Sequence, residues 1–250
     1  MVVVDLNADV GEGDVEDAAD AALMPFITSA NIACGVHAGN AEVMAATVTL
    51  AARSGVAVGA HPGLDDREHF GRREFQISRE AVAALVTDQV EALAHVARQQ
   101  GIRLRHVKPH GALYNMAARD IGVARAIADA IARLDASLTL VGLSGSELIR
   151  AGDAAALKTC AEAFADRGYR ADGSLVPRSA PGALLENADT VADRAVSMVR
   201  EQRVVAVDGT IVPVRVDTIC VHGDTAGAAV LARRIRAELE AAGVNVRAGC

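Results

Sequence analysis

Four of the seven histidines in this sequence directly follow short apolar runs, at His37, His61, His110 and His222. Aspartate, asparagine and lysine residues accompany them. A carboxylate or a neutral imidazole can act as a general base toward water, and lysine or asparagine can stabilise a developing oxyanion. These residue types together indicate hydrolysis at a carbonyl group.

A bound metal is an alternative way to activate water. Asp9, His37 and His61 are the candidate ligands for a divalent metal, because carboxylate and imidazole groups are common ligands in hydrolytic metal sites. The sequence contains no HxH or HExxH spacing. The residues alone therefore leave the metal-dependent and metal-free readings both open.

Phosphate-binding motifs give a negative result. Neither lysine, Lys108 or Lys158, follows a glycine, so the GxxxxGK[ST] loop of many ATPases is absent. The pair Gly11 and Gly13 lacks the third glycine of a dinucleotide fingerprint. The chain is thus not an obvious P-loop ATPase.

The elements that position these side chains alternate between short apolar runs and helical patterns. The seven runs are residues 2–6, 30–34, 56–59, 104–108, 138–142, 157–164 and 217–221. Residues 81–97 have apolar positions at helical spacing, with Ser78 as a candidate N-cap. This βα alternation predicts a parallel sheet, and its length favours a closed or nearly closed barrel over a doubly wound open sheet.

The domain organisation is expected to be simple. No linker-like segment or change in composition divides residues 1–250, so we predict a single domain. Two β-rich runs flank Asp208-Gly209, a hairpin turn signal, and predict a small β-hairpin insertion near residues 203–214.

Composition and charge exclude several classes of function. The chain is 51% hydrophobic, with a net charge of −7, and its charges are interleaved, so nucleic acid is not an expected partner. No cationic leader and no apolar stretch of about 18 residues occurs, which predicts a cytoplasmic protein without a membrane span. The four cysteines are scattered without a CxxC pair, which argues against a disulfide framework and a zinc knuckle. We expect Cys34, Cys160 and Cys220 to be small buried residues.

Two long motifs, SANIACGVHAG at residues 29–39 and VKPHGALYN at residues 107–115, carry a resemblance to a known family. Together with residues 5–13, 59–63, 70–73, 164–178 and 220–224, they resemble the LamB/YcsF family of 5-oxoprolinase components. The match covers nearly the whole chain. The resemblance implies an α/β fold, a seven-stranded (β/α) barrel that is TIM-barrel-like and of the glycoside hydrolase/deacetylase type.

The resemblance also implies which residues form the site. It falls on eleven polar residues but does not settle their individual roles. We assign Asp9, His37, His61, Lys108, His110 and Asp224 to catalysis. We assign Asn7, Glu12, Asn115, Arg178 and His222 to substrate binding. Asn40 and Thr225 depart from the residues usual in the family, Asp and Asn, and put one contact each in doubt.

The implied activity is hydrolysis of a cyclic amide C–N bond, the ATP-dependent opening of 5-oxoproline (pyroglutamate) to L-glutamate, ADP and phosphate. The complex would use ATP with Mg²⁺, and the implied partners are subunits B and C. In this picture a partner or the whole complex transfers the phosphoryl group, Asp9 or His110 is the base, Lys108 stabilises charge, and Arg178 holds the substrate carboxylate.

Two other functions stay open at this stage. One is a metal-dependent deacetylase or amide hydrolase that acts without ATP, which a bound divalent metal would support. The other is a non-catalytic subunit that only binds substrate or partners. Whether ATP or another nucleotide binds this chain, and whether it forms a homo-oligomer, are also left open by the sequence.

Overall fold

Seven parallel strands close into a barrel in this computed structural model, which describes residues 2–15, 17–178, 180–222 and 227–250. The strands are β1 Val3–Val10, β2 Ser29–Ala33, β3 Ala57–His61, β4 His106–Val107, β5 Thr139–Leu143, β6 Lys158–Ala163 and β9 Thr218–His222. Pairing of β1 with β9, in the register Asp5 to Thr218, completes the ring. The predicted seven-stranded barrel is confirmed, and the open sheet is excluded.

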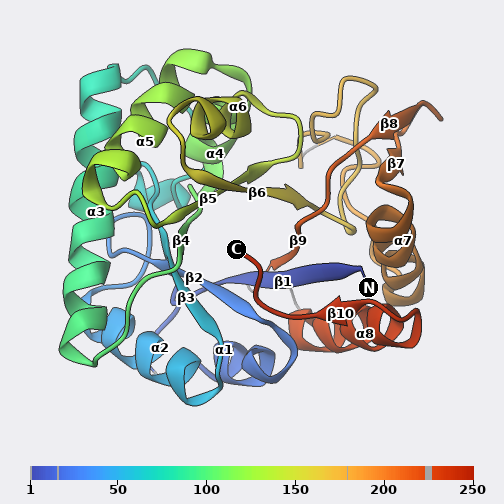
Figure 1. Cartoon of the computed structure of the whole chain (residues 1–250), viewed down its shortest axis with the longest axis horizontal. Coiled ribbons are helices and arrows are strands. Elements are labelled where there is room, and N and C mark those ends of the chain that lie inside the picture. Colours follow the sequence, from blue (N-terminus) through green and yellow to red (C-terminus); the bar gives the residue numbers. More distant parts are fainter. Residues whose placement is uncertain (1, 16, 179, 223–226) are drawn as a thin grey trace.

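Helices surround the ring of strands, as Figure 1 shows. They are α1 Ala18–Leu23, α2 Ala41–Arg53, α3 Arg79–Gln99, α4 Gly111–Arg119, α5 Ile121–Leu134, α6 Glu147–Ala154, α7 Ala188–Glu201 and α8 Ala228–Ala241, with 3-10 turns η1 Met24–Phe26 and η2 Arg67–His69. In α3 the Ser78 side chain accepts a hydrogen bond from the backbone N–H of Ala81, as the N-cap prediction requires. Val82, Val86 and Val90 bury the face of α3 that packs on the barrel.

The first strand is longer than the sequence predicted. β1 extends to Val10, so Asn7 and Asp9 belong to the strand and not to the loop that follows it. Polar residues alternate with Leu6, Ala8 and Val10, which are all fully or almost fully buried. The prediction was wrong at this point because polar residues are normally read as the end of a buried strand, whereas this barrel has a polar interior.

That interior is held together by hydrogen bonds. Asp5 accepts hydrogen bonds from Ser29 at 2.6 Å and from Thr218 at 2.6 Å, and the Asn7 side-chain amide donates to Thr218 at 2.7 Å and to Glu162 at 3.0 Å. TIM barrels usually fill this space with branched apolar side chains. Here the cost of burying polar groups is offset by pairing them with one another.

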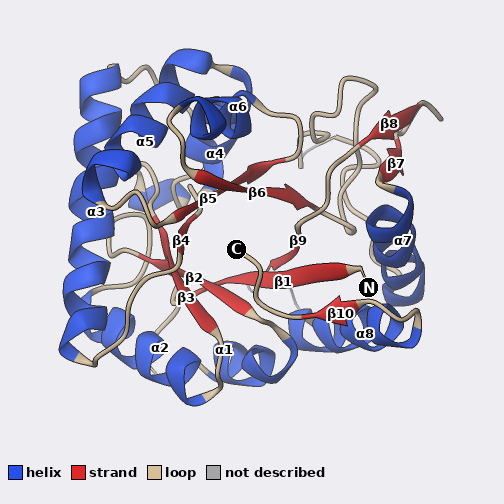
Figure 2. Ribbon diagram, viewed as in Figure 1, coloured by secondary structure: helices blue, strands red, loops and turns tan. Residues whose placement is uncertain are grey.

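A hairpin stands outside the barrel. Strands β7 Arg203–Val205 and β8 Ile211–Pro213 pair antiparallel, with Val204 opposite Val212 (Figure 2). Gly209 in the connecting turn has a φ of 86°, a left-handed conformation that suits glycine.

The last residues of the chain lie near the middle of the ring in Figure 1. Strand β10 Asn245–Val246 adds to the edge of β1, and Cys250 beyond it is joined to Cys160 by a disulfide, with Cα atoms 5.6 Å apart. Cys160 lies in the first half of β6, so the tail covers the end of the barrel at which the strands begin. This corrects the expectation that Cys160 is only a small buried residue, because scattered cysteines carry no sequence signal for a pair 90 positions apart.

No helix within the described residues is long and apolar enough to cross a membrane.

Candidate active site

The predicted site residues converge at the carboxyl ends of the strands. Asp9 lies near the end of β1, His61 is the last residue of β3, and Lys108 and His110 directly follow β4. This is the end of a (β/α) barrel where active sites are built, because loops from all strands meet there.

Lys108 is the buried centre of the cluster. Its Nζ lies 2.9 Å from Asp9 Oδ1, 2.8 Å from Glu162 Oε1, 3.2 Å from Asn7 Oδ1 and 3.0 Å from Cys220 Sγ. Burial by itself would lower the pKa of Lys108, but Asp9, Cys220 and Glu162 outweigh it and raise that pKa well above its usual value. Lys108 is therefore a permanent cation whose three N–H groups all have acceptors within the protein.

The two oxygens of Asp9 have different surroundings. Oδ1 accepts hydrogen bonds from Lys108 and, at 2.9 Å, from the Asn31 side-chain amide. Oδ2 lies 3.4 Å from His61 Nε2. Asp9 is thus anchored through Oδ1, and Oδ2 is the oxygen directed at the imidazole cluster.

The hydrogen positions on His61 and His110 follow from backbone contacts. His61 Nδ1 lies 2.7 Å from the Lys108 carbonyl oxygen, and His110 Nε2 lies 2.9 Å from the Phe70 carbonyl oxygen. A carbonyl oxygen only accepts, so each of these nitrogens carries a hydrogen. When both rings are neutral, the remaining nitrogens, His61 Nε2 and His110 Nδ1, present lone pairs to each other across 3.0 Å.

His110 and His37 are kept neutral by their surroundings. Burial, followed by the proximity of His61, lowers the pKa of His110 to about 3. Burial, His110 and His61 also lower the pKa of His37 far below its usual range. At neutral pH neither His110 nor His37 is therefore expected to carry a second proton.

Glu12 and His37 form the other side of the cluster. The His37 ring stacks on that of His110 with centroids 3.9 Å apart, and Glu12 Oε1 lies 3.5 Å from His37 Nε2 and 3.4 Å from His110 Nδ1. His37 is fully buried, and the absence of a side chain at Gly63 makes room for it, since a Cβ there would come within 2.5 Å of His37 Nδ1.

Two groups of three side chains in the described parts of the chain have the spacing of metal ligands. Asp9, His61 and His110 make one group, and Glu12, His37 and His110 make the other. His37 therefore shares a group with Glu12, and His110 takes the place beside Asp9 and His61 that the sequence analysis gave to His37. Five side chains that can offer a lone pair or a negative charge converge here, an arrangement that a divalent cation would stabilise.

The cluster opens into a cavity of about 750 Å³. Asp9, Glu12, His61, Lys108 and His110 line its inner end. Five arginines line it as well, namely Arg72, Arg119, Arg167, Arg170 and Arg178. An anionic ligand could thus be held by an arginine while its other end reaches the histidines.

A comparison of the whole sequence with known families identifies the family of this chain. Residues 4–249 match the model of the LamB/YcsF family. This chain belongs to the LamB/YcsF family. Relatives described as the A subunit of 5-oxoprolinase share 51% identity over 99% of this chain and 100% of the protein from Tolumonas auensis, and 52% identity over 98% of this chain and 95% of the protein from Methylococcus capsulatus.

Known structures agree with this LamB/YcsF assignment. A lactam utilization protein from Thermus thermophilus superposes with a TM-score of 0.92 at 46% identity, over 99% of this chain and 100% of that one. A family 4 carbohydrate esterase from Streptomyces lividans has a TM-score of 0.50 at 12% identity, over 98% of this chain and 91% of that one. The second likeness shows a shared barrel fold alone.

Not every predicted site residue of this LamB/YcsF chain joins the cluster. Asn115 and Arg178 are exposed on the cavity wall. Asn7 lies deeper, bonded to Glu162 and Thr218. His222 ends β9 opposite Asp9, but its side chain and the whole of Asp224 lie outside the described residues, as does Thr225.

Three buried residues of the site were missed by sequence reasoning. Glu162 and His106 were read only as parts of the runs 157–164 and 104–108, and Tyr114 was quoted in a motif without a role. His106 Nε2 lies 2.8 Å from Asn31 Oδ1, and Glu162 contacts Lys108 directly. A signal was present, because acidic and basic residues inside apolar strands are rarely buried without partners.

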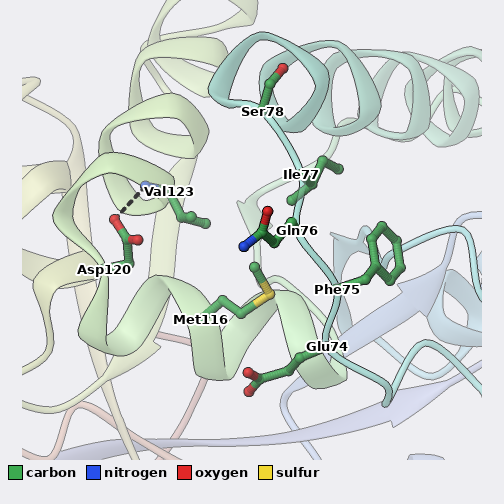
Figure 3. A pocket seen from close by; sticks show the side chains of 8 residues that line it. All are labelled: Glu74, Phe75, Gln76, Ile77, Ser78, Met116, Asp120 and Val123. Atoms are coloured by element: carbon green, nitrogen blue, oxygen red, sulfur yellow. Dashed lines mark hydrogen bonds between the residues drawn. The ribbon is translucent and has the colours of Figure 1, made fainter.

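A second hollow, of about 670 Å³, shares Glu74 with the main cavity. Figure 3 shows the side chains that line this second hollow. It is lined by the segment from Glu74 to Ser78 and by Met116, Asp120 and Val123. Asp120 caps α5 through the backbone N–H groups of Gly122 and Val123, so its carboxylate already has a structural role. The lining side chains do not form a cluster suited to hydrolysis.

Proposed function

We propose that this chain is the A subunit of a 5-oxoprolinase, and that it opens the lactam ring of 5-oxoproline to L-glutamate within a complex that consumes ATP. The observation that carries the proposal is the convergence of Asp9, Glu12, His61 and His110 at the closed end of an arginine-lined cavity. The descriptions of the two relatives and of the Thermus protein support the same reaction.

The roles follow from the contacts. Asp9 Oδ2 is the proposed general base toward water, since Oδ1 is already engaged by Lys108 and Asn31. Lys108 pairs with Asp9 and adds positive charge close to the developing oxyanion. Arg178 and Asn115 on the cavity wall hold the substrate carboxylate, for which a guanidinium offers bidentate geometry.

ATP use is assigned to the complex. An unactivated lactam is a poor electrophile, and transfer of the γ-phosphoryl group of ATP to the carbonyl oxygen would make that oxygen a leaving group. Water then adds to the carbonyl carbon and the C–N bond breaks with the proton passing to the amine, which leaves an acyl phosphate. A second water molecule hydrolyses this acyl phosphate to the carboxylate and free phosphate. Because this chain contains no P-loop, we assign MgATP and phosphoryl transfer to the partner subunits B and C.

A second candidate function is that of a metal-dependent amide hydrolase or deacetylase that needs no ATP. The facing lone pairs of His61 Nε2 and His110 Nδ1, 3.0 Å apart, favour it because a cation between them would remove their repulsion. Asp9, His61 and His110 would hold the metal, with Glu12 beside them. A divalent metal there would polarise a carbonyl group and acidify water.

These functions are separated by measuring glutamate release from 5-oxoproline with MgATP, for this chain alone and with subunits B and C. Release by the mixture alone, and its loss in Asp9→Asn, supports the 5-oxoprolinase. His95→Gln, on the exposed face of α3, is the matched control and should keep full activity. Activity of the isolated chain on acetylated or amide substrates, lost on chelation, would instead support the metal-dependent hydrolase. Full turnover of the complex with Asp9→Asn would favour a protein that only binds.

In this proposal residues 1–250 act as one domain in the cytoplasm, with the β7–β8 hairpin as an insertion.

A further inference from the structure

We propose that Glu162, a residue to which no function was given above, is a positioning residue that holds Lys108, and through it Asp9, in the geometry needed for hydrolysis. The inference rests on the proposed function for its catalytic part. Its structural part stands on contacts alone.

Glu162 is completely buried, near the carboxyl end of β6. Its Oε1 lies 2.8 Å from Lys108 Nζ and accepts a hydrogen bond of 3.0 Å from the Asn7 amide. A carboxylate in this position would destabilise the fold by several kcal/mol without a cationic partner. An uncharged acceptor would satisfy the Asn7 amide equally well, so the charge of Glu162 serves Lys108.

The Lys108 ammonium contacts the carboxylates of both Glu162 and Asp9. Its Nζ lies between Glu162 Oε1 and Asp9 Oδ1, at 2.8 Å and 2.9 Å. The Phe164 ring, whose centroid is 5.7 Å from Nζ, adds a cation–π contact. Two charge-assisted contacts define the position of the ammonium more narrowly than one would, because each is directional and strong.

The contacts lead from Glu162 through Lys108 to Asp9, the proposed general base. Lys108 holds Asp9 Oδ1, and this leaves Oδ2 facing His61. Without Glu162, the ammonium would move toward Asp9 and could engage both carboxylate oxygens. Glu162 thus holds the ammonium at Oδ1 of Asp9 although Glu162 itself does not touch the reacting atoms.

The experiment uses the fact that the chain has only two lysines. Protein labelled with ¹⁵N at lysine Nζ gives two signals, and Lys158→Arg assigns them. Lys158 is exposed and bonds only the Gly249 carbonyl oxygen among the described residues, so it is the internal reference. At one fixed neutral pH, the Nζ protons of Lys108 in the wild-type chain should exchange with water at least about tenfold more slowly than those of Lys158.

Glu162→Gln keeps the shape of the side chain and removes its charge. We expect the Lys108 signal to shift and its exchange to accelerate while the Lys158 signal stays in place. In the complex with subunits B and C, kcat should fall about 10- to 100-fold, a typical effect of losing an outer-shell partner. The KM for 5-oxoproline should change less than about twofold, since Glu162 does not touch the substrate.

Ser29→Ala is the matched control, because it removes a buried hydroxyl from the same polar interior, one that bonds Asp5 and neither Lys108 nor Glu162. Its Lys108 signal should remain at the wild-type position.

An unchanged Lys108 signal in Glu162→Gln would overturn the inference. So would a shifted signal with full kcat, and so would wild-type Lys108 protons that exchange as fast as those of Lys158, a result that needs no variant. If the wild-type complex released no glutamate, the proposed function would fail, while the lysine signals would still decide whether Glu162 holds Lys108.

Discussion

His61 Nε2 lies 3.0 Å from His110 Nδ1, and the other nitrogen of each ring faces a backbone carbonyl oxygen. When both rings are neutral, these backbone contacts direct a lone pair of each ring toward the other, next to the carboxylates of Asp9 and Glu12. A site with this arrangement can bind a cation without any rotation of its histidine rings.

The first prediction is that the chain binds one divalent metal ion and not two. Both candidate groups of ligands use His110 Nδ1, which has a single lone pair to give. Titration calorimetry with Zn²⁺ or Mn²⁺ on chelator-treated protein should give one equivalent. His110→Ala should weaken binding at least about tenfold, and His95→Ala should not. Two equivalents of equal affinity would contradict the shared-ligand argument.

The two lysines should differ in their effect on stability. Lys108→Met leaves Asp9 and Glu162 facing an apolar side chain, and breaking a buried ion pair in this way costs about 3–5 kcal/mol of unfolding free energy. Lys158→Met removes an exposed group and should cost less than about 0.5 kcal/mol. Urea unfolding of both variants measures the difference. Equal losses would mean that the Lys108 contacts do not stabilise the fold.

The free energy of unfolding should decrease as the pH is lowered, because of His106. Burial, and then Lys108, lower the pKa of this histidine to about 3 in the folded state, against about 6.5 when unfolded. The unfolded chain therefore binds more protons between these values, so stability is fully present above pH 6.5 and is lost as the pH falls toward 3. At pH 5 the loss from His106 is about 2 kcal/mol.

His106→Gln isolates this contribution, since His37 and His110 remain in both proteins. Unfolding free energies are compared at two pH values, one above the unfolded pKa and one near pH 5. The variant should lose about 2 kcal/mol less than the wild type between them. If the unfolding free energies of both proteins changed equally between the two pH values, His106 would become protonated in the folded protein as readily as in the unfolded chain, and the prediction would be wrong.

Arg178 should act on substrate affinity. Its guanidinium is exposed on the cavity wall, away from the imidazole cluster, so Arg178→Ala should raise the KM for 5-oxoproline about tenfold and leave kcat nearly unchanged. Arg53→Ala, at the end of α2 and outside the cavity, is the control. A fall in kcat alone would move Arg178 from substrate binding to the chemical step.

The cysteines should divide into two pairs. Cys34 and Cys220 are free, and Cys160 is joined to Cys250. Under oxidising conditions, alkylation of the denatured chain should modify two cysteines before reduction and all four after it, as intact mass shows. In protein kept under cytoplasmic reducing conditions all four should react, because thiols stay reduced there. Four modified cysteines in the oxidised sample would exclude the disulfide.

The sequence predicted the barrel well because strand and helix signals alternate clearly along the chain. Ser78 and the apolar spacing after it are local signals, and local signals determine where α3 begins. The polar rim was also predictable, since Asp9, His61 and His110 follow apolar runs in parallel strands.

The interior could not be predicted in the same way. Glu162 and Lys108 are far apart in sequence, and only closure of the ring between β6, β9 and β1 brings Glu162 to Asn7 and Lys108. The grouping of His37 with Glu12, instead of with Asp9, likewise depends on ring stacking against His110. Such contacts depend on side-chain directions across the barrel, which spacing along the chain does not contain.

The contact between Gly59 and His106 links two positions on neighbouring strands. A Cβ at Gly59 would collide with the His106 ring, which occupies that space to reach Asn31. Evolution can therefore alter these positions only together. Homologues that carry a side chain at position 59 should have lost the imidazole at position 106, and with it the group that orients Asn31 toward Asp9. Paired substitutions at these two sites would mark branches of the family whose chemistry has diverged.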